Sequence, residues 1–386
     1  MFDFDSYKDA FVPYAEANAL VTDAIERRHT VGIPTACINI MQHSYIDRLA
    51  GAPIGSYQKD PRGVYLAMSK NIGVRLIDQF IPENPLELGD NGYESKTLTA
   101  TTGAERIELD GIVIDSPESV AEHMERFTFP ALREKIAAFD EDRTMRNIMD
   151  GELAFQKVFG DSILKTGYAF VHFPYLEYYA YGYENYFAAY ALYPEVIEKC
   201  FALQADYALL NNNAAAKLYE HKLLPPLYRL DHDMADSRGT LVDIKSLDKI
   251  WTPHFARCVE PLVKSGVNLI WHCDGNLSAM LPRLLDAGVK GFQGFQYEDG
   301  MDYKKICAMK TRDGDSPIIW AGVSVTRTLP FGTPRGVRDE LKFLVENGPE
   351  AGLFLGASSS VVPGVRWENI RALVDGLKYY GERGRK

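Results

Sequence analysis

The chain has 386 residues, of which 46% are hydrophobic and 25% charged, the composition of a globular protein with a sizeable core. A net charge of −11 argues against nucleic acid or anionic lipid as a partner, because both are held mainly by Lys and Arg. No stretch approaches the roughly 20 apolar residues of a membrane span, and the acidic start Met1–Asp5 is unlike a secretory signal. Five cysteines without a CxxC pair indicate reduced thiols, so we expect a cytoplasmic protein.

The first half of the chain predicts an irregular start to an α/β domain. The order is two strands, a loop-rich insertion with a hairpin, a long helical stretch and a third strand: 31–40, 74–80, 82–115 (hairpin 106–114), 118–159 and 167–173. No internal repeat or low-complexity linker interrupts the chain. We therefore predict one domain over residues 1–386, with an N-terminal helical extension and an insertion at about 82–165.

The second half alternates strands and helices at short intervals. Strands are expected at 227–230, 267–271, 291–295, 317–323 and 352–355, and helices at 246–263, 277–285, 303–309, 334–345 and 367–379. This alternation is typical of parallel strands joined by crossover helices. We predict an α/β fold, a (β/α)8 TIM barrel. A doubly wound open sheet is the alternative, but no GxGxxG follows a strand.

Polar residues end these strands, most clearly after the apolar run 267–271. His272 and Asp274 are two residues apart on an extended strand, so they share one face, and Cys273 points the opposite way. At the carboxyl edge of a barrel the two would form a metal-ligand pair or a proton-transferring pair. The alternative is that Asp274 caps the following helix and His272 merely bonds to it.

A tyrosine-rich segment precedes the second half. Eight tyrosines fall between Tyr175 and Tyr193. Rigid amphipathic rings suit a pocket for a flat ligand. Packing against the barrel or a subunit interface is the more common use of such rings, and both interpretations stay open.

The strand ends resemble those of the uroporphyrinogen decarboxylase superfamily, in particular its cobalamin-dependent methyltransferase branch. The matching pieces lie in order over most of the chain: Arg48–Gly51, Gly73–Asp78, Asp231–Met234, Gly239, His272–Asn276, Leu284–Val289, Gln296–Asp302, Ala321–Val323, Gly332–Pro334 and Ser358–Ile370. The resemblance implies a (β/α)8 barrel with its active site at the carboxyl ends of the strands.

Positions at which this chain differs from the family pattern indicate which branch of the family it resembles. The segment 33–40 lacks the arginines that would clamp a tetrapyrrole with several carboxylates, so decarboxylation of that substrate is not expected. The resemblance to thiol-methylating members implies a zinc-binding pattern of His-x-Cys with a second Cys near the C-terminus. In this chain Asp274 stands in place of the first Cys, and Ser358–Ser360 in the region of the second. Because thiol activation favours soft zinc ligands, a methylcobalamin:thiol methyltransferase is a weaker alternative, and Cys273 supplies a thiolate only if the strand twists.

The remaining branch removes methyl groups from small donors such as methoxylated aromatics and passes them to cobalt on a separate corrinoid-binding protein. The resemblance therefore implies an O-demethylase methyltransferase component. Its leaving oxygen must be protonated or polarised. We predict catalytic roles for His272, Asp274, Glu298, His232 and Asp233, with His272, Asp274 and Glu298 as ligands if zinc is bound.

Substrate-binding residues are expected around this group. They are Asp231, His43, the tyrosines Tyr178, Tyr183 and Tyr186, Ser359, and Arg327 as a carboxylate ligand. Glu298 could instead favour a helix N-terminus, and Arg327 could lie on the surface. A lyase acting on a small carboxylic acid and a non-enzymatic binding protein are the alternative functions. A homodimer is one oligomeric state that the sequence leaves open.

Overall fold

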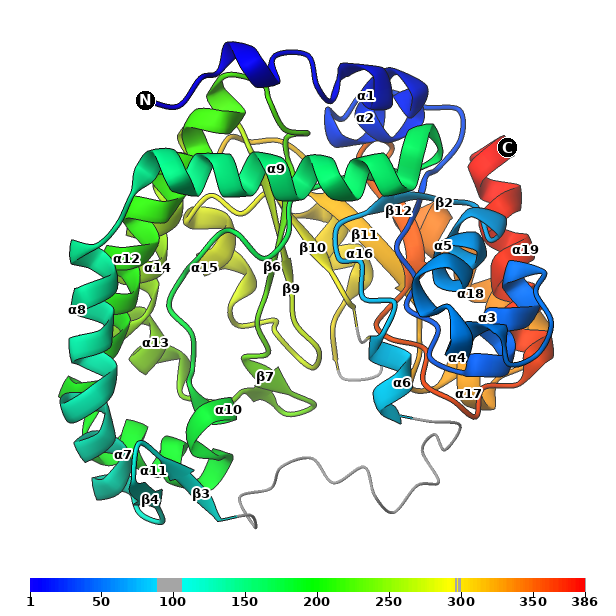
Figure 1. The fold of residues 1–386 in the computed structure, drawn as a ribbon. Helices are drawn as coiled ribbons and strands as arrows, with labels where there is room; N and C mark the ends of the chain where they lie inside the picture. Colours follow the sequence, from blue (N-terminus) through cyan, green and yellow to red (C-terminus); the bar gives the residue numbers. More distant parts are fainter. Residues whose placement is uncertain (89–105, 296, 298–299, 386) are drawn as a thin grey trace.

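The computed structural model describes residues 1–88, 106–295, 297 and 300–385. Eight parallel strands form one sheet in the order β5-β2-β1-β12-β11-β10-β9-β6, which is chain order around a ring. The fold is thus the predicted (β/α)8 type (Figure 1). The strands are β1 (Thr35–Ala36), β2 (Val74–Ile77), β5 (Leu164–Lys165), β6 (Leu227–Asp231), β9 (Asn268–His272), β10 (Gly291–Gln293), β11 (Ile318–Val323) and β12 (Leu353–Ala357).

The sheet is continuous except between β5 and β6. There a single parallel bridge joins Gly167 to Tyr228, and the Gly167 N–H donates to the Leu227 carbonyl at 3.3 Å. Two hairpins lie outside the ring: β3 (Ile107–Leu109) with β4 (Ile112–Ile114), as the sequence predicts, and β7 (Ala235–Asp236) with β8 (Gly239–Thr240).

Helices surround the strands (Figure 1). In chain order they are η1 (Asp5–Tyr7), α1 (Val12–Ala17), α2 (Ala19–Ile25), α3 (His43–Ala50), α4 (Ser56–Lys59), α5 (Pro61–Asn71), α6 (Asn84–Leu88), α7 (Pro117–His123), η2 (Met124–Thr128), α8 (Phe129–Ala137), α9 (Glu141–Phe159), η3 (Gly160–Ser162), α10 (Tyr178–Tyr181), α11 (Tyr183–Leu192), α12 (Pro194–Glu220), α13 (Ile244–Ile250), α14 (Thr252–Lys264), α15 (Leu281–Asp286), α16 (Tyr303–Ala308), α17 (Thr328–Phe331), α18 (Pro334–Asn347) and α19 (Trp367–Arg383). Among the described helices, none has the length and apolarity to cross a bilayer.

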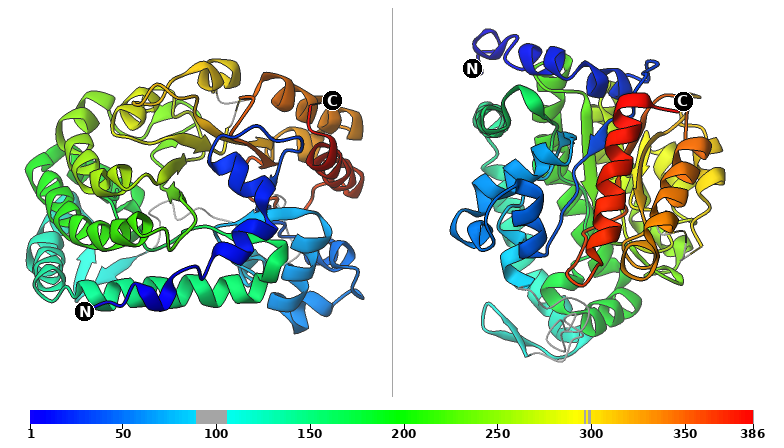
Figure 2. Two further views of the ribbon diagram at one scale, coloured as in Figure 1. Left: turned by 90° about the horizontal axis from the view of Figure 1, so that it is seen from above. Right: turned by 90° about the vertical axis from the view of Figure 1, so that its right-hand side faces the viewer.

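One end of the ring is closed by the N-terminal helices. A separate apolar cluster inside the ring takes residues from seven strands and from α2: Val21, Ala24, Ile25, Ala36, Leu76, Leu164, Leu227, Ile270, Ile318, Trp320 and Phe354. Helices α1 and α2 lie across this end, opposite β7, α6 and α10 (Figures 1 and 2). Each buried Val, Leu, Ile or Phe side chain of this cluster contributes roughly 1.5–3 kcal/mol, so this end is a packed floor.

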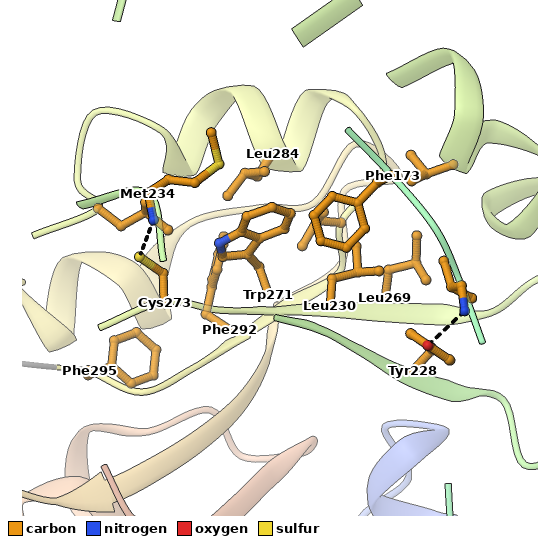
Figure 3. Close-up of a cluster of buried hydrophobic side chains, with 14 of the residues drawn as sticks. Phe173, Tyr228, Leu230, Met234, Leu269, Trp271, Cys273, Leu284, Phe292 and Phe295 are labelled. Atoms are coloured by element: carbon orange, nitrogen blue, oxygen red, sulfur yellow. Dashed lines mark hydrogen bonds between the residues drawn. The ribbon is translucent and has the colours of Figure 1, made fainter. Parts of the chain in front are cut away.

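The outward side chains of the strands pack against the helices. Figure 3 shows Trp271 and Cys273 of the β9 edge beside Met234 and the α15 residue Leu284. Leu269, Trp271 and Cys273 therefore share the outward face of the strand. Because side chains alternate along a strand, Ile270 and His272 face the interior of the barrel.

Several predicted elements differ from the structure. The strand predicted at 31–40 pairs regularly only at β1, Thr35–Ala36, and the helix predicted at 246–263 is divided into α13 and α14. The third strand is β5, at Leu164–Lys165, and not 167–173. After the Gly167 bridge, Ala169 has φ +64°, and the N–H groups of Phe170 and Val171 donate to the Tyr228 hydroxyl, so side chains replace a strand ladder here. The helix predicted at 277–285 differs as well, because it begins only at Leu281.

Candidate functional site

A polar cavity opens above the apolar floor, at the carboxyl ends of the strands. On β6 the inward residues change from Leu227 to Arg229 and Asp231. On β9 they change from Ile270 to His272. The cavity encloses about 510 Å³ and is lined by Cys37, Asn39, Asp78, Gln79, Ile81, Asn84, Tyr179, Arg229, Asp231, Asp233, His272, Gln293, Trp320, Ala357, Ser359 and Ser360. The period-two pattern of each strand thus places polar groups in the position expected of a barrel active site.

Three predicted residues meet at the edge of this cavity. One donor atom each from Asp233, His272 and Asp274 lies within 4.8 Å of the other two. The Asp233 Oδ1 accepts the Asp274 N–H at 3.0 Å, and the Ser359 hydroxyl donates to Asp274 Oδ2 at 3.1 Å. We call Asp233, His272, Asp274 and Ser359 the acid–imidazole cluster. Asp274 does not cap a helix, because α15 starts seven residues later, after Met280.

Two atoms of this cluster are buried without a hydrogen-bond partner among the described residues. They are Nδ1 of His272 and Oδ1 of Asp274. A buried polar atom left unsatisfied costs roughly 1–3 kcal/mol, so such atoms mark a position where a proton, water, ion or ligand would be stabilised. Burial also raises the pKa of Asp274. The neighbouring Asp233 and Asp231 charges act in the same direction, and His272 and the Ser359 hydrogen bond oppose them.

The glycine after β10 leaves room for the imidazole. Gly294 has φ +81°, and a Cβ built there would lie 2.5 Å from His272 Nδ1. A side chain at this position would therefore be both strained and in collision with the ring. The close approach of the Gly294 backbone fixes where the imidazole can lie.

A second network lies beside the cluster, around a buried arginine. Arg229 Nε is 2.5 Å from Asp78 Oδ2, its Nη1 is 2.9 Å from Asp231 Oδ2, and its Nη2 donates to Gln79 Oε1 at 3.1 Å. Asp78 is 2% and Arg229 8% exposed, so the pair is removed from water. Asp231 therefore lines the cavity as predicted, with one carboxylate oxygen already bound by Arg229.

His232 lies on the other side of the β6 end and has a different set of contacts. Its Nε2 accepts the Leu176 N–H at 2.9 Å, and the Tyr178 ring stacks on it with centroids 5.9 Å apart. The Tyr178 hydroxyl donates to the Asp233 carbonyl at 2.8 Å. Burial lowers the pKa of His232 to about 4, so the ring is neutral at pH 7. His232 and Tyr178 thus anchor the tyrosine-rich segment and are not among the described residues that line this cavity. His232 lines an adjoining hollow together with Asp231, Asp233 and Tyr179.

Other predicted residues lie away from the cavity. His43 is buried, with Nε2 2.9 Å from the Pro85 carbonyl and Nδ1 3.3 Å from Gln58. Tyr186 is 1% exposed among other aromatic rings, and Tyr183 packs against Tyr178. Arg327 precedes α17 and is not among the described residues lining the cavity, and Glu298 lies outside the described residues.

The sequence interpretation missed several residues of the cavity. They are Arg229, Asp78, Gln79, Gln293 and Tyr179. Of the tyrosines in the tyrosine-rich segment, Tyr179 is 67% exposed. The signal available for the first two was a charge within an apolar run or directly after one. Arg229 interrupts the apolar run 227–230, and Asp78 follows Ile77 of β2. A charge at an inward strand position is costly unless it has a partner across the barrel.

Cys273 is not a ligand to this site. Its sulfur accepts the Met234 N–H at 3.3 Å and faces the helix layer (Figure 3). Burial raises the pKa of its thiol, which keeps it protonated. The twist that would turn a thiolate toward His272 is absent from this strand end.

No family model matches this chain, and no curated protein matches it. Among solved structures, a methyltransferase from Methanosarcina mazei has a similar fold, with a TM-score of 0.53 and 13% sequence identity. The alignment covers 94% of this chain and 98% of the other. At this level of identity the likeness establishes a shared fold over nearly the full length of both chains.

Proposed function

We propose that this protein is a methyltransferase that moves a methyl group from a small donor, in particular a methoxylated aromatic, to the cobalt of a corrinoid bound to a second protein. The observation that carries the proposal is the acid–imidazole cluster, an imidazole and two carboxyl groups beside a polar cavity of about 510 Å³. A fold shared with a methyltransferase is consistent with this activity.

The chemistry requires help at the leaving oxygen. The carbon–oxygen bond of the donor breaks as the new bond to cobalt forms, and the electron pair of the broken bond stays on the oxygen, which takes up a proton. A phenolate leaves poorly, so a group that delivers this proton lowers the barrier. The corrinoid is a substrate in this scheme, brought by its carrier protein to the open end of the barrel.

His272 and Asp274 are the proton donors in our proposal. Burial raises the pKa of the Asp274 carboxyl, so it holds a proton more readily than an ordinary aspartate. His272 lines the cavity and Asp274 lies within 4.8 Å of it outside the described lining, so in our proposal His272 is the nearer group to the donor. Asp233 and Ser359 fix Asp274 through its backbone N–H and its Oδ2, which positions the acid before the substrate arrives.

The same residues suit zinc. Asp233, His272 and Asp274 would hold it through two carboxylates and one imidazole, and three protein ligands are the usual number in a catalytic zinc site. The unpartnered atoms of His272 and Asp274 fit this assignment. Zinc bound there would polarise the ether oxygen as a Lewis acid. This oxygen-rich set suits a hard leaving group better than a thiol acceptor.

The test is methyl transfer in solution. The protein is mixed with cob(I)alamin and a panel of methoxyarenes, and the cobalt absorption spectrum is followed. The proposal predicts methylcobalamin and one equivalent of the corresponding phenol. A silent spectrum across the panel, with CO2 released from a carboxylic acid substrate, would instead support a lyase that uses the same acid and imidazole.

A further inference from the structure

Three neighbouring strands of the barrel present one row of side chains to the cavity. Gln293 of β10 pairs in register with His272 of β9 on one side and with Trp320 of β11 on the other. Neighbouring strands lie roughly 4.8 Å apart, and residues in register point to the same face of the sheet. All three residues line the cavity, so one ligand lying across these strands can contact them together.

Each side chain of this row has one buried polar atom without a hydrogen-bond partner among the described residues. They are Nδ1 of His272, Oε1 of Gln293 and Nε1 of Trp320. Folded proteins rarely leave buried polar atoms unpaired, so three of them in one row mark a place where a ligand supplies the partners. The proposed reaction uses the His272 end of the row at the leaving oxygen. It leaves Gln293 and Trp320 without a role.

The other end of the Gln293 amide fixes its orientation. Its Nε2 donates to the Ser358 carbonyl at 3.3 Å, so a flipped amide would bring two carbonyl oxygens together. Oε1 is therefore an acceptor that needs a donor, whereas the indole N–H of Trp320 is a donor that needs an acceptor. The two atoms do not bond to one another, because neither has a partner among the described residues. The group that satisfies this pair must both donate and accept.

A methyl ether alone cannot satisfy the pair. Its oxygen accepts but does not donate, so it leaves Oε1 of Gln293 unpaired, whereas a hydroxyl group does both. We infer that Gln293 and Trp320 bind a free hydroxyl on the ring of the methyl donor, and that the protein thereby selects methoxyphenols over methoxyarenes without a hydroxyl. The inference rests on the proposed function and names its substrate class. It is independent of whether the acid–imidazole cluster holds a proton or zinc, because neither residue belongs to that cluster.

Isothermal titration of the full chain with matched pairs of ligands tests this. The 2-, 3- and 4-methoxyphenols are each compared with the methoxytoluene that has a methyl group in place of the hydroxyl. The methyl group is similar in size and more apolar, so a pocket that merely excludes water would prefer the methoxytoluene. We expect the methoxyphenol of at least one pair to bind about tenfold or more tightly, because its partner leaves buried polar atoms unpaired.

Two variants assign the preference to these residues. Gln293→Met keeps the length of the side chain but removes the acceptor, so most of the preference for the methoxyphenol should be lost. Trp320→Phe removes the N–H donor and should also weaken binding of the methoxyphenol. The control is Gln58→Met, which alters an exposed glutamine on α4 outside the described lining and should keep the preference of the parent.

Equal or tighter binding of the methoxytoluene in all three pairs overturns the inference, and so does an absence of binding by every ligand. A preference that persists unchanged in Gln293→Met overturns it as well. The proposed function is judged separately, by methyl transfer to cob(I)alamin. A preference for the methoxyphenol without any methylcobalamin would refute the methyl transfer and leave the hydroxyl selection standing. Methylcobalamin formed equally well from both members of every pair would do the reverse.

Discussion

Two residues of β9 and its edge carry the chemistry proposed for this protein, and their roles follow from where their side chains are held. His272 faces the interior because β9 alternates, and Asp274 reaches the same side two residues later. This juxtaposition could be predicted from the sequence. Asp233 and Ser359 follow two other strands and hold Asp274 by hydrogen bonds. These contacts could not be predicted from the sequence, because they depend on how the strand ends meet in the folded chain.

Metal content is the first prediction at this scale. If the acid–imidazole cluster binds zinc, the purified chain retains about one zinc ion after dialysis. Asp233→Ala and Asp274→Ala should each lose it, whereas Asp248→Ala, which removes an aspartate paired with Arg283 on the outer helices, should retain it. Mass spectrometry of the metal content reads this out without any activity assay. Active protein with essentially no zinc would assign the cluster to proton transfer alone.

Arg229 carries the second prediction. Arg229→Met leaves the buried Asp78 carboxylate without its cation and should lower the free energy of unfolding by about 3–5 kcal/mol. Arg238→Met removes an exposed ion pair with Asp236 and should cost less than about 1 kcal/mol. Urea unfolding at pH 7 measures both. Adding Asp78→Asn to Arg229→Met should restore much of the loss, and an unchanged midpoint for the single variant would contradict a stabilising role for this buried pair.

The segments joining the elements set the geometry of the cavity, and they were the least predictable part. The tyrosine-rich segment suggested a ring pocket, yet of its residues only Tyr179 is among the described lining of the main cavity. Tyr178 and Tyr186 are buried in packing contacts. Which tyrosine lines the cavity depends on the turn at Gly182 and on the hydrogen bond from the Leu176 N–H to His232. No periodicity in the sequence predicts either feature.

The turn after β10 gives a matched pair of glycine variants. Gly294→Ala and Gly314→Ala both place a side chain at positive φ, +81° and +86°. Gly314→Ala should lose about 1 kcal/mol of stability, and Gly294→Ala should lose more because its methyl group also collides with the His272 ring. Only the Gly294 methyl group meets His272 Nδ1, whereas Gly314 faces open space. We therefore expect methyl transfer to fall at least about tenfold in Gly294→Ala alone. Equal activity in the two variants would mean that the imidazole position is not set by this turn.

The anchor of the tyrosine-rich segment predicts a pH dependence. Burial lowers the pKa of His232 from 6.5 to about 4, so between these values the unfolded chain binds a proton that the folded chain does not. The stability that this provides is complete above pH 6.5 and is lost as the pH falls toward 4, up to about 3 kcal/mol.

A non-titrating variant isolates this effect. His232→Gln should lose about 2 kcal/mol less stability than the parent between pH 7 and pH 5 in urea unfolding. His29→Gln, at an exposed position, should follow the parent. Parallel losses in His232→Gln and the parent would show that this imidazole titrates normally in the folded chain.

The whole molecule shows how far periodicity alone determines a barrel. Five strands of the second half were predicted within a few residues, because their apolar runs pack on both faces. The first half was harder. β1 and β5 have only two residues each in regular pairing, and the chain between Gly167 and Phe173 satisfies its N–H groups through Tyr228 and Asn212. Hydrogen bonds to side chains that take the place of strand pairing leave no alternation of polar and apolar residues in the sequence.

The assembled barrel brings together charges that are far apart in the sequence. Asp78, Arg229 and His272 come from three strands, and only the ring order makes them walls of one cavity. The sequence could predict polar strand ends, but the pairing of Arg229 with Asp78 across 151 positions depends on how β2, β5 and β6 lie beside one another in the folded chain.

The central claim is that His272 and Asp274 make a poor leaving oxygen acceptable, and its most direct test is the dependence of the rate on the leaving group. Single-turnover methyl transfer to cob(I)alamin is measured with methoxyarenes whose phenols span a range of pKa. The parent should show a shallow dependence, since the proton is supplied. His272→Ala should be slower by ~10²- to 10⁴-fold for the poorest leaving groups and much less impaired for the best. Equal slopes and equal rates in the parent and in His272→Ala would contradict the account.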